Sequence, residues 1–196
     1  IHALFKDKFG NVWIGTQNSG IWRYGNSYGP GSLHSLELGF PEVDVTSFVQ
    51  LEDGLVAVAS DGHGIFVVDS MFQQQKRMEV AQGLTSNNVL SMSKSSNGFL
   101  WVVFWGGETC LVNPLTDEII KINYKGISDP IYNTKAVKEF SNGEVWVGTS
   151  GDGVYARDLD GNWKRIILSD ENQFKRRDLW VEDFGESKQG IRWVIT

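Results

Sequence analysis

Short glycine-rich segments that carry carboxylate, aromatic or imidazole side chains are the first candidates for chemistry in this sequence. The segment Trp105-Gly106-Gly107-Glu108 places an indole, whose flat apolar face can stack on a sugar ring, beside a carboxylate that accepts hydrogen bonds from hydroxyl groups. We therefore predict that Trp105 and Glu108 bind ligand. The alternative is that Trp105 packs between structural units and takes no part in binding.

Three other segments have the same character and add Asn18, His63 and Asp152 to the predicted ligand-binding residues. His63 stands two residues after Asp61, a pair that is either a fragment of a metal site or part of a turn. Because no further His or Cys lies nearby in the sequence, we predict no metal ion and no cofactor. Residues 158–162 resemble a calcium loop, but they lack its terminal Glu and are typical of a hairpin turn.

The sequence offers little support for catalysis. It has no Gly-x-Ser-x-Gly elbow, and its single cysteine, Cys110, falls in a predicted strand. Some pair among the 24 acidic residues will reach glycosidase spacing by chance, so paired carboxylates carry no weight here. We predict that this region is not an enzyme.

These segments are spaced by a repeat that runs through the whole chain. Its clearest copies are Gly-Asn-Val-Trp-Ile-Gly-Thr at 10–16 and Gly-Glu-Val-Trp-Val-Gly-Thr at 143–149; looser copies lie at 98–104 and 190–196, and a degenerate one at 54–60. The central position falls at residues 13, 57, 101, 146 and 193, in steps of 44, 44, 45 and 47. A period of roughly 40 to 50 residues indicates a repeat architecture.

Each repeat resolves into four short strands separated by turn residues. The third unit has them at 89–94, 99–104, 109–113 and 118–124. The same frame predicts fourth strands near 33–38, 76–81 and 163–168, and a first strand of a fifth unit near 179–184. The predicted units are 1–44, 45–88, 89–133 and 134–178, with a partial unit at 179–196.

The second strands are apolar on both faces, as in Leu100 to Phe104, whereas a sheet with one wet face alternates apolar and polar residues. These strands must therefore be covered on both sides. Four-stranded antiparallel blades stacked around an axis meet that requirement. We predict an all-β fold, a β-propeller fragment of four four-stranded antiparallel blades plus half of a fifth.

The repeated motif has a structural rationale. A Trp in the second strand buries roughly 150 to 250 Å² between blades, and a small residue two positions later leaves room for it or for the neighbouring blade. The predicted blade-motif residues are Trp13, Gly15, Thr16, Trp101, Trp146, Gly148, Thr149 and Trp193. The loops that follow these strands emerge on one face, where ligands often bind.

Residues 1–16, followed by Gly20-Ile21-Trp22-Arg23-Tyr24, resemble the two-component regulator propeller repeat, and residues 83–89 resemble that family's connection between blades. The second copy departs from the pattern because it lacks the Trp and the Gly-Thr pair. The family occurs in periplasmic sensor regions of bacterial hybrid histidine kinases. The resemblance implies a periplasmic ligand sensor, commonly for oligosaccharides, whose parent protein is anchored in the inner membrane and passes the signal to a kinase outside this sequence.

The composition sets limits on partners. The net charge of -6 argues against nucleic acid or an anionic membrane surface, both of which attract basic patches. A single cysteine excludes an intramolecular disulfide. Because the chain starts with Ile1 and an inner strand, we expect a piece of a larger propeller that contacts other blades, and that in isolation forms a homodimer or is only marginally stable.

We therefore interpret the chain as a non-enzymatic sensor propeller that binds a small molecule or an oligosaccharide. Two alternatives stay open at this point. One is a propeller enzyme acting on polysaccharides, a lyase or glycosidase, and the other is a scaffold that binds proteins.

Overall fold

The computed structural model describes residues 1–25, 32–33, 43–128, 131, 133–166 and 180–196. Over these residues the secondary structure consists of β-strands and two short 3-10 turns, η1 (Glu52–Gly54) and η2 (Val80–Gln82), with no α-helix. No helix among them is long and apolar enough to cross a membrane.

The strands form four four-stranded sheets and one two-stranded sheet. The first blade contains β1 (Ala3–Lys6), β2 (Val12–Gly15), β3 (Ile21–Tyr24) and β4 (Ser32–Leu33). The second contains β5 (Asp44–Gln50), β6 (Val56–Asp61), β7 (Gly64–Val68) and β8 (Gln74–Met78). The third contains β9 (Val89–Lys94), β10 (Leu100–Phe104), β11 (Cys110–Asn113) and β12 (Glu118–Lys121). The fourth contains β13 (Thr134–Glu139), β14 (Val145–Thr149), β15 (Val154–Arg157) and β16 (Trp163–Ile166), and the half-blade contains β17 (Asp183–Glu186) and β18 (Arg192–Ile195).

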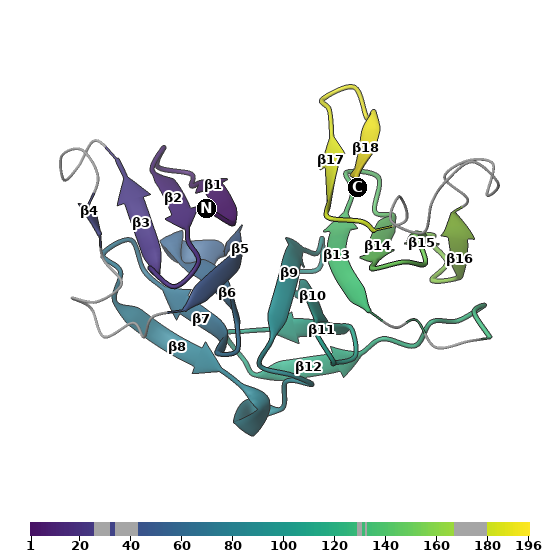
Figure 1. The fold of residues 1–196 in the computed structure, drawn as a ribbon, viewed down its shortest axis with the longest axis horizontal. Helices are drawn as coiled ribbons and strands as arrows, with labels where there is room; N and C mark the ends of the chain where they lie inside the picture. The colour runs from purple at the N-terminus through teal and green to yellow at the C-terminus, as the bar shows by residue number, and fades with distance from the viewer. Residues whose placement is uncertain (26–31, 34–42, 129–130, 132, 167–179) are drawn as a thin grey trace.

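The blades stand side by side in an open arc (Figure 1). Their first strands line its inner side, where β1 contacts β5, β5 contacts β9, β9 contacts β13 and β13 contacts β17. The predicted fold is thereby confirmed: four antiparallel blades and the first half of a fifth. The connections β2–β3, β6–β7, β10–β11 and β14–β15 leave one end of the blades, which we call the hairpin face. The turns after each first strand leave the opposite end, the turn face.

The Trp of the repeat motif points toward the following blade. Trp13 is fully buried and stacks on Phe72 of the second blade, with ring centroids 4.6 Å apart. Trp101 packs edge-on against Trp163 of the fourth blade at 6.4 Å. Each inner blade is therefore covered on both faces, and this explains why its second strand is apolar throughout.

The glycine of the motif sets the spacing between blades. A Cβ atom at Gly15 would lie 2.6 Å from Val45 of the second blade, and one at Gly148 would lie 2.4 Å from Val181. Both valines donate their backbone N–H to the residue after that glycine, Val45 to Thr16 at 3.1 Å and Val181 to the equivalent threonine at 3.0 Å. Backbone thus approaches backbone where the glycines stand.

The threonine of the motif closes the hairpin that follows it. Thr16 Oγ1 donates to the carbonyl of Gly20 at 2.8 Å, and Thr149 Oγ1 donates to the corresponding glycine at 2.9 Å. Ser60 supplies the same bond in the second blade, at 3.0 Å, although that copy lacks the Gly-Thr pair. The third blade has Phe104 at this position, so its hairpin is built without that hydroxyl.

The last residue of each later first strand holds the preceding blade on the turn face; we call Gln50, Lys94, Glu139 and Glu186 the clip residues. Gln50 accepts the backbone N–H of Lys8 at 3.2 Å, Lys94 pairs with Glu52 at 2.8 Å, and Glu186 accepts the N–H and hydroxyl of Ser141, both at 3.0 Å. Glu139 accepts from Ser95 Oγ at 2.7 Å, Ser96 N at 2.8 Å and Trp101 Nε1 at 2.7 Å. Neighbouring blades are therefore bonded to each other through polar side chains at this end.

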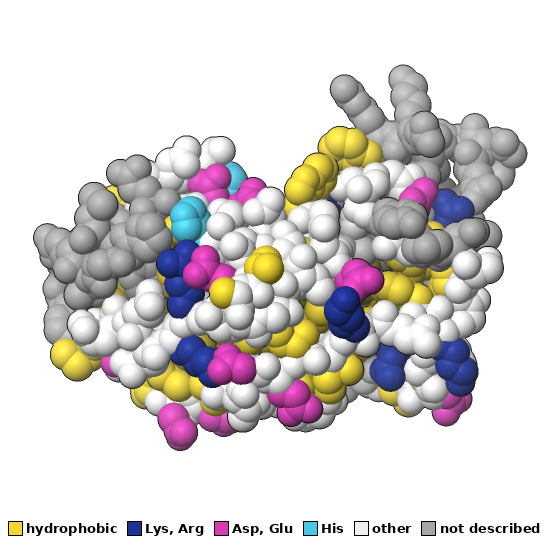
Figure 2. All heavy atoms as spheres, turned by 90° about the horizontal axis from the view of Figure 1, so that it is seen from below, with side chains coloured by type: hydrophobic (Ala, Val, Ile, Leu, Met, Phe, Trp, Pro, Cys, Tyr) yellow, Lys and Arg dark blue, Asp and Glu magenta, His cyan; other side chains and the backbone are white. Residues whose placement is uncertain are grey.

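The outer side of the arc is also cross-linked. Lys76 on β8 pairs with Asp117 of the third blade at 2.9 Å and donates to the carbonyl of Leu115 at 3.0 Å. Figure 2, which views the molecule from below, shows basic and acidic side chains next to one another with hydrophobic side chains between them. Both signs of charge are thus interspersed on this side.

Two expected strands differ from the structure, and a third is not tested. The strand predicted near 76–81 is β8 at Gln74–Met78, because Glu79 and Gln82 form a capping box that starts η2. The strand predicted near 179–184 is β17 at Asp183–Glu186, because Trp180 and Val181 bond to the fourth blade instead. The predicted strand at 33–38 lies mostly outside the described residues.

Trp193 also differs from its predicted place in a blade core. Its side chain is 49% exposed, whereas Trp13 and Trp101 are buried. Within the described residues no further sheet covers the face of β18 that carries it. Trp146 is half-buried, with its ring 4.8 Å from Phe140 and 5.9 Å from Phe184.

Candidate functional site

All five predicted ligand-binding residues lie in connections of the hairpin face. Asn18 lies in the β2–β3 connection, His63 in β6–β7, Trp105 and Glu108 in β10–β11, and Asp152 in β14–β15. Antiparallel strand order places these connections at the same end of the blades. They belong to different blades, however, so a common face does not make them one site.

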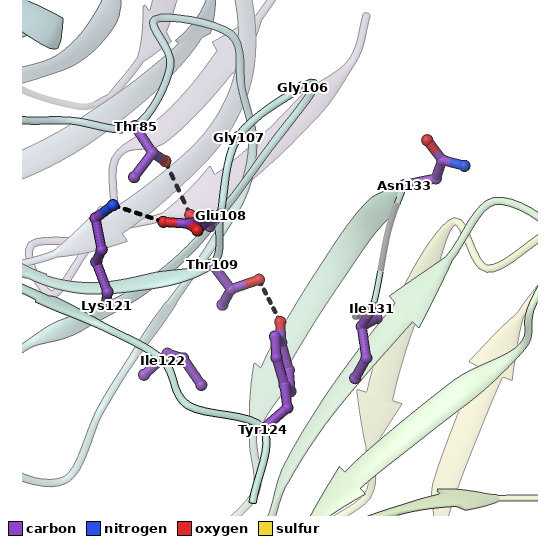
Figure 3. A pocket seen from close by; sticks show the side chains of 10 residues that line it. All are labelled: Thr85, Gly106, Gly107, Glu108, Thr109, Lys121, Ile122, Tyr124, Ile131 and Asn133. Atoms are coloured by element: carbon purple, nitrogen blue, oxygen red, sulfur yellow. Dashed lines mark hydrogen bonds and ion pairs between the residues drawn. The ribbon is translucent and has the colours of Figure 1, made fainter. Parts of the chain in front are cut away.

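A pocket of about 650 Å³ opens on this face where the third blade meets the fourth (Figure 3). It combines the end of the β10–β11 hairpin, the end of β12 and the connection to the fourth blade. Its lining residues are Thr85, Gly106, Gly107, Glu108, Thr109, Lys121, Ile122, Tyr124, Ile131 and Asn133. Of the five predicted residues, the pocket contains Glu108 alone.

Glu108 and Lys121 form the charged rim of the pocket. Glu108 Oε2 lies 2.7 Å from Lys121 Nζ, and both side chains are largely exposed. The hydrogen bond and charge of Glu108 raise the pKa of Lys121 above its ordinary value. Thr85 Oγ1 donates to the backbone carbonyl of Glu108 at 2.9 Å and fixes this end of the hairpin. A ligand hydroxyl can reach the carboxylate either beside the lysine or in its place.

Tyr124 and Thr109 form a buried polar contact in the wall of the pocket. The Tyr124 hydroxyl donates to Thr109 Oγ1 at 2.7 Å, and Thr109 is almost wholly buried. Burial raises the pKa of Tyr124 to about 12, despite the opposing effect of that hydrogen bond. The Tyr124 ring also packs edge-on against Trp163 of the fourth blade, at 4.8 Å. The phenol therefore stays protonated and rigid at neutral pH.

The rest of the wall is apolar and ends in an amide. Ile122 follows β12, and Ile131 lies beside Tyr124 from the connection to the fourth blade (Figure 3). Asn133 closes that side, and its backbone carbonyl accepts the N–H of Ser150 at 2.9 Å. The pocket thus offers an apolar wall, hydroxyl and amide groups, and one charged pair.

Trp105 stands outside the pocket in the same hairpin. Its backbone is held at both ends, since its N–H donates to Asn88 O at 2.9 Å and its carbonyl accepts from Ser86 Oγ at 3.0 Å. The side chain is 59% exposed and belongs to none of the buried clusters of the described residues. The indole is a fixed, solvent-facing surface next to the pocket.

Backbone atoms of Asn18, His63 and Asp152 take part in hydrogen bonds on the hairpin face. Asn18 adopts a positive φ of 58° and donates its N–H to Asp44 Oδ1 at 2.6 Å. The carbonyl of His63 accepts from an arginine on β8, while its Nδ1 is buried without a partner among the described residues. The Asp152 N–H donates to Thr149 Oγ1 at 2.9 Å. The described residues contain no group of three His, Cys, Asp or Glu side chains that could hold a metal ion.

Sequence reasoning missed Thr109, Lys121, Tyr124 and Asn133. The end of a fourth strand opens on the same face as the hairpin of its blade, and this rule of antiparallel order could have pointed to Lys121 and Tyr124. No local pattern indicates Asn133, which reaches the pocket through the connection between blades.

Residues 1–18 match the family model described as two component regulator propeller. No curated protein sequence matches the chain. The resemblance noted in the sequence is thus confirmed at its first copy.

Three solved structures are similar in fold. The extracellular domain of a hybrid two component system from B. thetaiotaomicron is 21% identical, with a TM-score of 0.78 over 97% of this chain and 25% of that one. The extracellular domain of a one component system from the same organism is 22% identical, with a TM-score of 0.68 over 87% of this chain and 24% of that one. Virginiamycin B lyase from Staphylococcus aureus is 12% identical, with a TM-score of 0.74 over 97% of this chain and 61% of that one.

At these identities the similarity shows the fold and not the activity. The chain spans about a quarter of the length of the two B. thetaiotaomicron domains. The protein is a β-propeller in which residues 1–18, within the first blade, match the two component regulator propeller model.

Proposed function

We propose that this chain is part of the ligand-sensing propeller of an extracytoplasmic two-component receptor, and that it binds an oligosaccharide without transforming it. The pocket between the third and fourth blades carries the proposal. It presents an apolar wall, a carboxylate, an amide and hydroxyl groups, which together suit a sugar with one apolar face and several hydroxyl groups. The first repeat and the two sensor-domain relatives in fold support the signalling role.

A periplasmic location and a downstream histidine kinase belong to the same proposal. Both rest on the family resemblance of the first repeat. Expression of the parent protein with a compartment-specific tag tests the first, and phosphotransfer by the parent protein tests the second.

Calorimetric titration tests binding at this pocket. We expect one of a panel of glucose, xylose, galactose and galacturonate oligosaccharides to bind the purified chain, and Glu108→Gln to weaken that binding about tenfold, since a hydrogen bond to a charged group contributes about 1.5 to 3 kcal/mol. Lys121→Met is the matched control: it removes the rim cation and leaves the carboxylate free. Unchanged affinity in Glu108→Gln would show that the ligand binds elsewhere.

The same titrations test Trp105. If its indole extends the pocket, Trp105→Ala weakens oligosaccharide binding while thermal melting stays unchanged. If affinity is unchanged, the exposed indole serves another purpose.

Incubation of the same oligosaccharides with the chain separates a sensor from an enzyme. A glycosidase canonically uses two carboxyl groups that flank the scissile bond. Among the described lining residues Glu108 is the sole carboxylate and no histidine occurs. We therefore expect chromatography to show intact oligosaccharide, and time-dependent release of products would favour the lyase or glycosidase alternative.

We further propose that the fifth sheet contacts other blades or a second copy. Trp193 and Ile195 on β18 are 49% and 50% exposed, which leaves an apolar surface that promotes association. Light scattering at micromolar concentration tests this point: Ile195→Lys should shift an associated state toward the monomer. If the chain without this substitution is already monomeric, self-association is contradicted.

A further inference from the structure

Trp180, which no repeat pattern singled out, occupies a repeated position at the entrance to a first strand. The residues that immediately precede Val45, Val89, Thr134 and Val181 are Asp44, Asn88, Asn133 and Trp180. The first three are polar, and Asn88 and Asn133 each accept a backbone N–H from the adjacent hairpin. At the junction with the fifth sheet the chain places an indole instead.

The Trp180 side chain packs into no blade core. It is 49% exposed and lies outside the buried clusters of the described residues. Its backbone is held by a bridge to Ser150, and Nε1 lies 3.8 Å from the position a Cβ would occupy at Gly151. Lys135 Nζ lies 5.7 Å from the ring centroid and is itself paired with Glu182. The indole is thus a positioned surface group, like Trp105.

Trp180 is linked to the pocket through one residue. Ser150 donates its N–H to Asn133, which lines the pocket, and bridges on its other side to Trp180. Neighbouring strands lie about 4.8 Å apart, so Asn133 and Trp180 are separated by two such spacings, about 10 Å. This separation is short enough for one extended ligand to contact both.

We propose that Trp180 forms a second sugar subsite beside the pocket, so that the ligand is an oligosaccharide with at least one ring in the pocket and a further ring stacked on the indole. This inference rests on the proposed function. Asp152 is exposed in the hairpin that also carries Ser150, where its carboxylate can accept hydroxyl hydrogen bonds from the second ring. The amphipathic indole provides the apolar face that a sugar ring needs.

The test is the dependence of affinity on ligand length, measured with glucose, xylose, galactose and galacturonate oligomers of increasing length. For the wild-type chain we expect affinity to rise by about tenfold at the length that reaches the indole, since the added ring gains a stacked contact with an aromatic side chain. Trp180→Ala should abolish this rise and leave the affinity for the shortest bound sugar unchanged. Trp180→Phe should restore part of it.

Trp193→Ala is the matched control, because Trp193 is equally exposed but lies on β18 away from the hairpin face. It should retain the full rise with length. Quenching or a blue shift of tryptophan fluorescence on binding should diminish in Trp180→Phe, which gives a readout independent of affinity.

The outcomes separate the two proposals. If no oligomer binds the wild-type chain, both the proposed function and this inference are wrong. If short sugars bind and the gain with length survives in Trp180→Ala, the pocket stands and the second subsite is wrong. If Trp180→Ala loses binding of the shortest sugar as well as the gain with length, Trp180 belongs to the pocket itself and not to a second subsite.

Discussion

The two faces of this propeller use the same kinds of residue for opposite purposes. On the turn face, the carboxylate of Glu139 accepts three hydrogen bonds from the preceding blade. On the hairpin face, the carboxylate of Glu108 is largely exposed and pairs with one exposed lysine, Lys121. The carboxylate of Glu139 is thus satisfied by the neighbouring blade, whereas that of Glu108 remains accessible to a ligand.

The tryptophans follow the same division. Trp101 is buried between blades and donates its N–H to Glu139 of the next blade, whereas Trp105, four residues later, faces solvent. In a repeat protein, the type of a residue alone therefore does not tell whether its side chain packs between blades or faces a ligand. The position within the repeat does, because strands bury their side chains and hairpins present them.

The largest expected effect is that of Glu139→Ala on stability. Loss of its three hydrogen bonds leaves the buried Trp101 N–H unpaired, and we expect the free energy of unfolding to fall by about 3 kcal/mol. Urea unfolding at neutral pH measures the change. Glu108→Ala on the hairpin face is the matched control and should leave the urea midpoint nearly unchanged. Equal losses of stability in the two variants would contradict the difference between the two faces.

The second effect concerns the spacing of the blades near the hairpin face. Gly148→Ala should destabilise the chain by about 2 kcal/mol, because the new Cβ overlaps Val181 in a well-packed junction. Thermal melting measures the loss. In the double variant with Val181→Ala the two losses should add only in part, since the second change removes the Cγ1 contact at 2.4 Å while the Cβ contact at 2.6 Å stays. Simple additivity would show that the glycine serves its own strand and not the junction.

A third effect probes the buried polar contact in the pocket wall. Tyr124→Phe should cost about 1 kcal/mol, because the nearly buried Thr109 hydroxyl loses its partner while the ring still packs on Trp163. Urea unfolding measures this. Since the pKa of Tyr124 is raised to about 12, an absorbance titration should also lose a tyrosine that ionises near pH 12 in the variant. If the variant gives the same absorbance titration as the wild-type chain, the assignment of the raised pKa to Tyr124 is wrong.

The smallest effect is the acid sensitivity of the turn face. Burial favours the neutral form of Glu139, but hydrogen bonds from Ser95, Trp101 and Ser96 outweigh it and hold its pKa below the ordinary value of 4.5. The hydrogen bonds of Ser141 likewise lower the pKa of Glu186. Carboxylates with lowered pKa stabilise the fold fully above the unfolded pKa, and this contribution is lost as pH falls through the folded pKa.

Stability should therefore decline below about pH 4.5, and the decline should be shallower in Glu139→Gln, which has no charge to lose at that position. Thermal melting across this pH range measures both slopes. A parallel decline in the two proteins would assign acid sensitivity to other groups.

Much of the architecture was predictable because it depends on periodic burial. The repeat of Trp13, Trp101 and Trp146 predicted the second strand of each blade, and the double-sided apolar pattern predicted stacked blades. The strand ends at Met78 and Asp183 were predicted wrongly, since a capping box and a bond to the neighbouring blade decide them. Strand ends thus depend on local caps and on contacts with the neighbouring blade, which the repeat period does not reveal.

The candidate site was predictable only in part. Glycine-rich hairpins pointed to the hairpin face, and Glu108 lines a pocket there. Asn18 and His63 belong to other blades, and Asp152, although it is in the fourth blade, lies in a hairpin outside that pocket. Hairpins of different blades are separated by whole sheets, so likeness of sequence does not bring their side chains together.

The amino-acid sequence by itself determined the number of blades, their order and the face on which the hairpins emerge, because these follow from the period of buried residues and from antiparallel strand order. Only the tertiary structure decided that Glu108, Lys121 and Asn133 share one pocket and that Trp180 lies one residue away from it. The physical reason is that a pocket between blades depends on how closely they approach. That approach is determined by side-chain packing across the junction, to which both blades contribute.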